Sequence, residues 1–310
     1  MRKPGHEATQ QRGQTIVAVL KEAVSTNVTL SATLATLVTL ATLAVSAIDA
    51  QAANVLVVSS DASQLELKEG KLAPTGFYLN ELMQPVKILL DAGHTLTFAT
   101  PQGKAPTLDR SSTNKMFFDN DEASAAAHLA LLERMKLTAV EGSPVISLAR
   151  VEQIGYARYD AVYVPGGHAP MQDLLDSPQL GKLLSAFHAG GKLTALVCHG
   201  PIALLSTLPD AAGFSGRLAR EGHAAADPAW LYAGYRMTAF SNREEALSKA
   251  ALGGGAMRFY PQTALEQAGG SYASAAQPWG PLVVADRELL TGQNPFSALP
   301  LARAMLARLK

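Results

Sequence analysis

Short apolar runs rich in β-branched residues alternate along this chain with longer segments whose apolar residues have helical spacing. The short runs predict strands, and the first of them, Asn54-Val-Leu-Val-Val-Ser59, is typical of a strand buried on both faces. The alternation predicts an α/β fold with a doubly wound, mostly parallel sheet and helices on both faces. Strands are expected at 54–59, 94–100 and 161–164 and in a run ending at Val197, and helices at 75–90, 122–135 and 177–189.

The remaining segments have weaker patterns. Residues 109–120 predict an irregular loop, and 236–240 a further strand. Residues 283–291 predict a strand or hairpin, and 298–309 a closing helix. Residues 209–235 are rich in Ala, Gly and Pro without a sustained period, which predicts a long surface excursion; whether it is a lid, a site wall or an ornament stays open.

The N-terminal segment differs in composition from the rest. Scattered basic residues precede an uncharged Thr/Ala/Leu run at 28–48, and Ala50-Gln-Ala52 has the spacing of a signal-peptidase site. We therefore expect residues 1–52 to be a signal peptide or membrane anchor and 53–310 to form a single domain. Export, most simply to a periplasm, is the expected localisation. The alternatives are an uncleaved anchor through 28–48 or, if the start is misassigned, a cytoplasmic protein.

Composition narrows the classes of function. The chain has 310 residues, 48% of them hydrophobic, and equal numbers of basic and acidic residues, 26 each. This balance gives no field that attracts a phosphate backbone, so we expect no nucleic-acid partner. A single cysteine excludes an internal disulfide and a cysteine-rich metal site, and the seven histidines show no recurring ligand spacing, so no metal is expected.

The only cysteine stands where the strand ending at Val197 turns into Cys198-His-Gly-Pro201 and a helix-like segment. A side chain on such a strand-to-helix turn is lifted clear of the sheet edge, and the N–H groups that open a helix favour negative charge. We therefore expect Cys198 to lean toward the thiolate and to act as a nucleophile. The alternative is a buried cysteine that packs as a small hydrophobe.

A cysteine nucleophile needs groups that move protons and stabilise charge. His199 is adjacent in sequence, and Gly166-Gly167-His168 follows a strand in a predicted binding loop. The N–H groups of Gly167 and His199 are candidates for an oxyanion hole, although a plain tight turn is the alternative for the glycines.

Several glutamates are candidate partners of this cysteine and histidine. Glu81 is the one acidic residue in an otherwise apolar helix start, where partial burial would raise its pKa. Glu244 and Glu245 follow the strand at 236–240 and could orient the histidine.

Ordered motifs carry a resemblance to a known family over the whole chain after the leader. The motifs are Thr75-Gly-Phe-Tyr-Leu-Asn-Glu81-Leu-Met-Gln-Pro85, Tyr163-Val-Pro-Gly-Gly-His168, Ala195-Leu-Val-Cys-His-Gly-Pro201, Phe240-Ser-Asn-Arg-Glu-Glu245 and Leu290-Thr-Gly-Gln-Asn-Pro-Phe-Ser297. With these motifs the chain resembles the ThiJ/PfpI superfamily and, within it, the glutathione-independent glyoxalases of the chaperone type.

The resemblance implies a flavodoxin-like sandwich with Cys198 as nucleophile, His199 as its partner and Glu81 as the proton-handling carboxyl. Glu245 is the implied orienter, with Glu244 as its alternative. Ala169 stands where relatives usually have glycine after Pro-Gly-Gly-His, and we expect it to narrow the pocket mouth.

The implied activity is conversion of 2-oxoaldehydes such as methylglyoxal to 2-hydroxy acids such as lactate, without a cofactor. The expected partners are the aldehyde substrate and a second copy in a homodimer, with membrane contact only through the leader. The alternative is a non-enzymatic stress protein, either a holdase or a sensor in which Cys198 is oxidised. Glutamine amidotransfer needs a late His-x-Glu pair, and no histidine follows His223.

Overall fold

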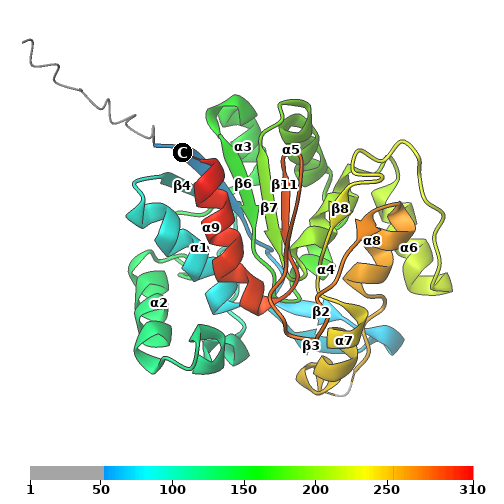
Figure 1. Ribbon diagram of the computed structural model, residues 1–310, viewed down its shortest axis with the longest axis horizontal. Helices are drawn as coiled ribbons and strands as arrows, with labels where there is room; N and C mark the ends of the chain where they lie inside the picture. The colour runs from blue at the N-terminus through cyan, green and yellow to red at the C-terminus, as the bar shows by residue number, and fades with distance from the viewer. Residues whose placement is uncertain (1–51, 254, 310) are drawn as a thin grey trace, which may run out of the picture. The chain divides into compact units, whose positions relative to one another are not determined.

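The computed structural model describes residues 52–253 and 255–309 (Figure 1). The predicted leader therefore falls almost wholly outside the described residues. None of the described helices is long and apolar enough to cross a membrane.

A seven-stranded sheet in the order β10-β11-β7-β6-β1-β4-β5 forms the centre of the domain. All neighbouring strands are parallel except β10, which pairs antiparallel with β11 at one edge. This confirms the predicted doubly wound α/β fold. The strands of this sheet are β1 (Asn54–Val58), β4 (Thr95–Thr100), β5 (Ile146–Ser147), β6 (Ala161–Val164), β7 (Leu193–Val197), β10 (Val283–Asp286) and β11 (Leu289–Gly292).

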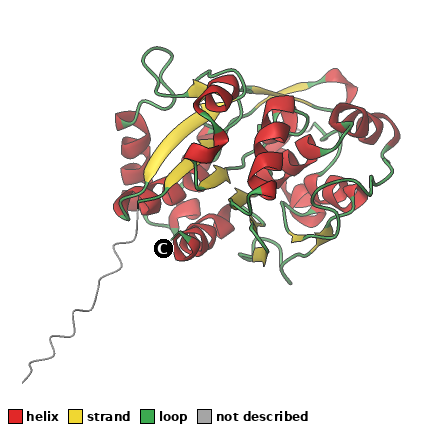
Figure 2. Ribbon diagram, turned by 90° about the horizontal axis from the view of Figure 1, so that it is seen from above, coloured by secondary structure: helices red, strands yellow, loops and turns green. Residues whose placement is uncertain are grey.

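Alternate residues of the central strands feed two separate cores, one on each face of the sheet. On one face, Val55 and Val57 pack beneath helices α1 (Leu79–Asp91), α2 (Glu122–Arg134) and α9 (Ala298–Arg308). On the other face, the core includes residues of α3 (Leu148–Ile154), α4 (Pro170–Asp173), α5 (Pro178–Ala189), α6 (Ala211–Glu221) and α8 (Pro261–Ala268). Figure 2 shows from above how these helices enclose the strands.

Most predicted elements form close to their expected bounds, and the first departures concern residues 75–120. The helix expected from residue 75 begins at Leu79, because Phe77 forms a parallel β-bridge with Leu108 and its N–H donates to the Thr107 carbonyl at 2.9 Å. The loop expected at 109–120 contains the short 3-10 helices Arg110–Thr113 and Lys115–Phe118.

The prediction that residues 209–235 form a long surface excursion was wrong in part. This segment contains α6, and Trp230 and Tyr232 beyond it are fully buried. Gly213 and Gly216 lower the helix propensity of α6, so the Ala- and Gly-rich composition hid the helical spacing of Phe214 and Leu218. The strand expected at 236–240 shortens to β8 (Arg236–Met237), which pairs with β9 (Ser271–Tyr272) outside the main sheet. The other two-stranded sheet consists of β2 (Gln64–Glu66) and β3 (Leu72–Pro74).

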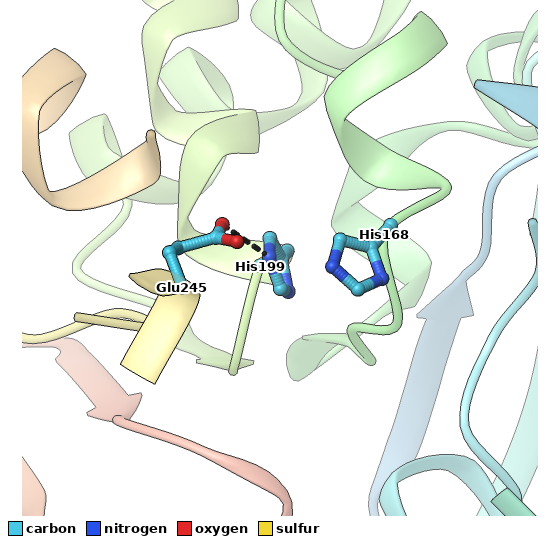
Figure 3. Close-up of side chains that lie close together, drawn as sticks. All are labelled: His168, His199 and Glu245. Atoms are coloured by element: carbon cyan, nitrogen blue, oxygen red, sulfur yellow. Dashed lines mark hydrogen bonds and ion pairs between the residues drawn. The ribbon is translucent and has the colours of Figure 1, made fainter. Parts of the chain in front are cut away.

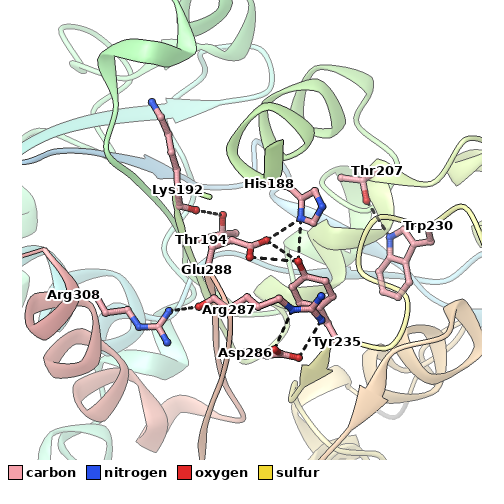
Figure 4. A network of polar contacts seen from close by, with 10 residues as sticks. All are labelled: His188, Lys192, Thr194, Thr207, Trp230, Tyr235, Asp286, Arg287, Glu288 and Arg308. Atoms are coloured by element: carbon pink, nitrogen blue, oxygen red, sulfur yellow. Dashed lines mark hydrogen bonds and ion pairs between the residues drawn. The ribbon is translucent and has the colours of Figure 1, made fainter. Parts of the chain in front are cut away.

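A polar network fixes the end of this segment at the amino end of β11 (Figure 4). Glu288 Oε1 lies 2.8 Å from His188 Nδ1, and the Tyr235 hydroxyl donates to the same carboxylate at 3.2 Å. The Arg287 guanidinium lies 3.3 Å from the centroid of the Tyr235 ring. The end of this segment, at Tyr235, is thus packed against α5 and the β10–β11 hairpin, which argues against a lid there.

Candidate active site

Cys198 occupies a sharp turn directly after the central strand β7. Its φ of 60° lies in the left-handed region, which is uncommon for a residue other than glycine and characteristic of a nucleophile elbow. The Cys198 N–H donates to the Gly292 carbonyl at 2.9 Å, and its own carbonyl accepts from the Phe240 N–H at 2.8 Å. The turn leads into a 3-10 helix, Gly200–Thr207. Backbone hydrogen bonds therefore hold the strained turn in place.

The Cys198 side chain is 2% exposed, yet it lines a cavity of about 510 Å³ at the carboxyl ends of the strands. Burial raises the pKa of the thiol well above its ordinary value, and the nearby Glu81 carboxyl raises it further. The expectation that the resting cysteine leans toward the thiolate was wrong. Loss of hydration in this apolar site outweighs the favourable helix-terminus field, so the thiol stays protonated until a base takes the proton.

His199 is the base within reach. Its Nδ1 lies 3.2 Å from the Cys198 Sγ, and its Nε2 lies 2.9 Å from Glu245 Oε1. Burial lowers the pKa of His199 to about 3 and raises that of Glu245 to about 7. The imidazole is therefore neutral. When Glu245 is ionised, it accepts the Nε2–H and leaves Nδ1 free to accept the thiol proton.

The structure separates the two neighbouring glutamates. Glu244 forms a capping box with Ser241 at the start of α7 (Asn242–Ser248) and accepts hydrogen bonds from Gln293 and Asn294. Glu245, one residue later, faces His199. Of the two candidates, Glu245 is thus the one in contact with the histidine.

Glu81 enters the site from the first turn of α1 and is fully buried. Its Oε2 accepts hydrogen bonds from the Gly166 N–H at 2.9 Å and the Gly167 N–H at 3.1 Å. Burial raises its pKa to about 8, while hydrogen bonding to Cys198 and to the two amides opposes that rise. Glu81 therefore carries a proton in the resting site at neutral pH.

The two glycines permit this close approach. A Cβ on Gly166 would lie 2.5 Å from Glu81 Oε2 and 2.6 Å from Cys198 Cβ, and Gly167 has a φ of 75°. The Gly167 N–H, expected to serve an oxyanion, donates to Glu81 in this state. The loop thus brings Glu81 against the nucleophile, and oxyanion binding at Gly167 would require that hydrogen bond to change partner.

His168 completes the polar part of the site (Figure 3). Its ring lies 4.3 Å from that of His199, its Nε2 has no hydrogen-bond partner, and burial lowers its pKa to about 4. Ligand atoms of His168, His199 and Glu245 lie within 4.8 Å of one another, a spacing that sequence reasoning did not foresee. A metal there would compete with the His199–Glu245 hydrogen bond, so these groups fit proton transfer better than resident metal binding.

Apolar side chains from distant segments form the cavity walls. Sequence reasoning did not identify them as walls, because they come from segments far apart in the chain, among them the N-cap of α1 and two 3-10 helices. Ala169 does not line the cavity: it is 1% exposed and starts α4, so the expected narrowing of the mouth was wrong. The main wall residues are Tyr78, Phe117, Phe240, Trp279 and Phe296.

Comparison with known proteins gives consistent results. A family model described as ThiJ/PfpI family-like matches residues 72–247. The chain is 28% identical to a probable glutathione-independent glyoxalase of Schizosaccharomyces pombe, over 83% of this chain and 98% of that protein. It is 27% identical to a protein/nucleic acid deglycase of Staphylococcus aureus over 49% of each chain. The crystal structure of glyoxalase III from Candida albicans has the same fold, with a TM-score of 0.56, 20% identity, and coverage of 83% of this chain and 98% of that one.

Proposed function

The chain belongs to the ThiJ/PfpI-like family, and from this premise we propose that it converts 2-oxoaldehydes to 2-hydroxy acids without glutathione. The similarity to a probable glutathione-independent glyoxalase along nearly the whole of that relative supports an enzyme of this kind. Methylglyoxal, with lactate as its product, is the simplest substrate. The proposal rests chiefly on one observation: a thiol facing a cavity lies 3.2 Å from a neutral histidine nitrogen and against a protonated carboxyl.

The first step adds the sulfur to the aldehyde. His199 Nδ1 takes the thiol proton while the Cys198 sulfur bonds to the aldehyde carbon, and the electron pair of the C=O bond moves to its oxygen. That oxygen takes a proton from the Glu81 carboxyl, which gives a hemithioacetal. Glu245 stabilises the imidazolium that forms, because it accepts the Nε2–H at 2.9 Å.

The second stage is an internal redox exchange that needs no external oxidant. The ionised Glu81 removes the hydrogen of the sulfur-bearing carbon as a proton, the C–H electron pair forms a C=C bond, and the ketone oxygen takes the proton held by His199, which gives an enediol. Glu81 then gives its proton to the neighbouring carbon and takes one from the hydroxyl of the sulfur-bearing carbon, which leaves a 2-hydroxy thioester, so one carbon is oxidised and the other reduced. Water then cleaves the thioester, which releases the 2-hydroxy acid and restores the thiol. A carboxyl with a pKa of about 8 suits both roles near neutral pH.

Lactate formation from methylglyoxal tests the proposal. We expect the wild type to form lactate and Cys198→Ala to lose at least about 1,000-fold in kcat/KM, because the covalent path is removed. Glutathione should not be required. Lactate formation that persists in Cys198→Ala would overturn the mechanism.

A non-enzymatic stress protein would require other properties of this site. A cysteine redox sensor needs an accessible thiol of low pKa, whereas burial raises the pKa of Cys198, which disfavours that role. A holdase role would be favoured by suppression of aggregation that survives Cys198→Ala, together with no turnover of any aldehyde.

A further inference from the structure

The cavity in front of Cys198 is apolar and aromatic well beyond the reacting atoms. Its walls include Phe117, Phe240 and Phe296, and Leu247 and Trp279 remain partly exposed where they line it. Among the described residues, no Lys, Arg, Asp or Glu side chain lines it. A charged substituent would therefore lose its hydration there without gaining a partner, while an apolar one would gain from burial.

The cavity is also larger than the smallest substrate requires. Its volume is about 510 Å³. Cavities of roughly 300–1,000 Å³ commonly enclose drug-sized ligands. Methylglyoxal has only a few non-hydrogen atoms and fills the space of a few waters, at about 30 Å³ each. It would leave most of the apolar wall without contact.

Trp279 adopts a strained backbone conformation in the cavity wall. Its φ of 67° is an outlier for a bulky residue. The Trp279 N–H donates to Glu244 Oε1 at 2.8 Å, and its ring lies 5.6 Å from that of Phe240. Phe240 in turn stacks on His199 at 4.7 Å. A continuous aromatic surface thus runs from the base that activates the thiol to Trp279, with the indole at its outer end.

We propose that the preferred substrates are 2-oxoaldehydes with an uncharged aryl or similarly bulky apolar substituent, which packs against Trp279 and Phe240 while the aldehyde reaches Cys198. This inference rests on the proposed function and specifies its substrate class. Glu244 acts in it as a positioning residue, because it holds the backbone of Trp279.

Steady-state kinetics with phenylglyoxal and methylglyoxal test the preference. We expect kcat/KM for phenylglyoxal to exceed that for methylglyoxal by at least about 10-fold. Trp279→Gly should lower the phenylglyoxal value about 10-fold more than the methylglyoxal value, because only the larger substrate packs against the indole. Glycine is the useful replacement because a φ of 67° suits it, so the variant loses the ring without added backbone strain. Trp279→Phe should recover part of the loss.

Controls separate specificity from folding and from failure of the chemistry. Val140, which is 99% exposed and does not line the cavity, provides the matched variant Val140→Gly, for which both values should equal those of the wild type. A preference for methylglyoxal, or an equal loss for both substrates in Trp279→Gly, would overturn the inference.

A binding experiment covers the case in which neither aldehyde is turned over. Acetophenone lacks the aldehyde, so its binding to Cys198→Ala can be measured by ligand-observed NMR without chemistry. Binding that weakens at least about 10-fold when Trp279→Gly is added supports an aryl pocket even if the glyoxalase proposal fails. Absence of binding would refute the aryl pocket independently of the reaction.

Discussion

At the scale of single residues, most ionisable groups around the nucleophile are held in their uncharged forms. Burial raises the pKa of Glu81 to about 8 and that of the Cys198 thiol well above its ordinary value, while it lowers the pKa values of His168 and His199. Near neutral pH the sulfur, its carboxyl neighbour and both imidazoles are therefore uncharged. Charge develops only when a substrate triggers proton transfer, which lets a reactive group persist in an apolar cavity.

Glu81 should make the stability of the protein depend on pH. Its pKa rises from 4.5 to about 8 on folding, so between these values the folded state holds a proton that the unfolded state has lost. The free energy of unfolding of the wild type should therefore fall with rising pH, relative to Glu81→Gln, by about 1.4 kcal/mol per pH unit across that window. Urea denaturation of both proteins from pH 4 to 9 measures this difference. Parallel curves would contradict the raised pKa.

The pH dependence of activity should report the same groups. Activity requires ionised Glu245, with a pKa of about 7, and protonated Glu81, with a pKa of about 8. We expect kcat/KM to rise with pH through the first value and fall through the second, with apparent values that belong to the coupled site. The profile with methylglyoxal checks this. A rate that stays level well above pH 9 would show that Glu81 does not act as the acid.

Two adjacent glutamates offer a matched pair of variants. Glu245→Gln should lower kcat/KM at least about 100-fold with little loss of stability, because it removes the charge that stabilises the imidazolium. Glu244→Gln should cost roughly 1–3 kcal/mol of stability, because Glu244 is buried and binds Ser241, Gln293 and Asn294. Its methylglyoxal activity should remain within a fewfold of wild type. Kinetics and urea denaturation of both variants distinguish the catalytic role of Glu245 from the structural role of Glu244. The opposite pattern of losses would assign the catalytic role to Glu244.

At the scale of elements, helix ends show how local chemistry sets boundaries. Asp210 caps α6 by accepting the Gly213 N–H at 2.9 Å, and a Cβ on Gly213 would lie 2.0 Å from that carboxylate. Asp210→Ala should therefore cost about 1 kcal/mol of unfolding free energy. Activity should be unchanged, since α6 contributes no side chain to the cavity. Denaturation and a lactate assay check both statements, and no change in stability would show that the cap is dispensable.

The same helix shows why part of the fold escaped sequence reasoning. β1, β6 and β7 are buried on both faces, so their continuous apolar runs predicted them as strands. In α6, Phe214 and Leu218 have helical spacing, but Gly213 and Gly216 lower the helix propensity of so short a segment. Composition therefore masked a helix that its caps and tertiary packing stabilise.

The candidate site divides in a similar way. Cys198, His199 and the Gly166-Gly167 loop were found because strand ends converge at one edge of a parallel sheet. The contact between His199 and Glu245, rather than Glu244, depends on the first turn of α7 and could not be chosen from sequence spacing. The direction of the pKa shift of Cys198 was predicted wrongly, because it depends on how deeply the thiol is buried, which a turn motif does not reveal.

At the scale of the whole molecule, the site joins both sides of the sheet. Cys198 and Glu81 belong with the core beneath α1 and α9, whereas α4, which follows His168, packs into the opposite core. The Tyr163 hydroxyl donates to the Glu81 carbonyl and ties the start of α1 to β6. The geometry of the nucleophile and its carboxyl therefore depends on the complete domain.

That domain should fold and act without the N-terminal segment. Both cores and every residue assigned to the site lie between residues 53 and 309. A variant that lacks residues 1–48 should keep the urea midpoint and the kcat/KM of the full chain, because it loses none of those groups. If the leader is a signal peptide, N-terminal sequencing of the exported protein should give a start near residue 53. Loss of folding in the shortened variant would contradict the prediction, because it would show that the domain needs residues 1–48.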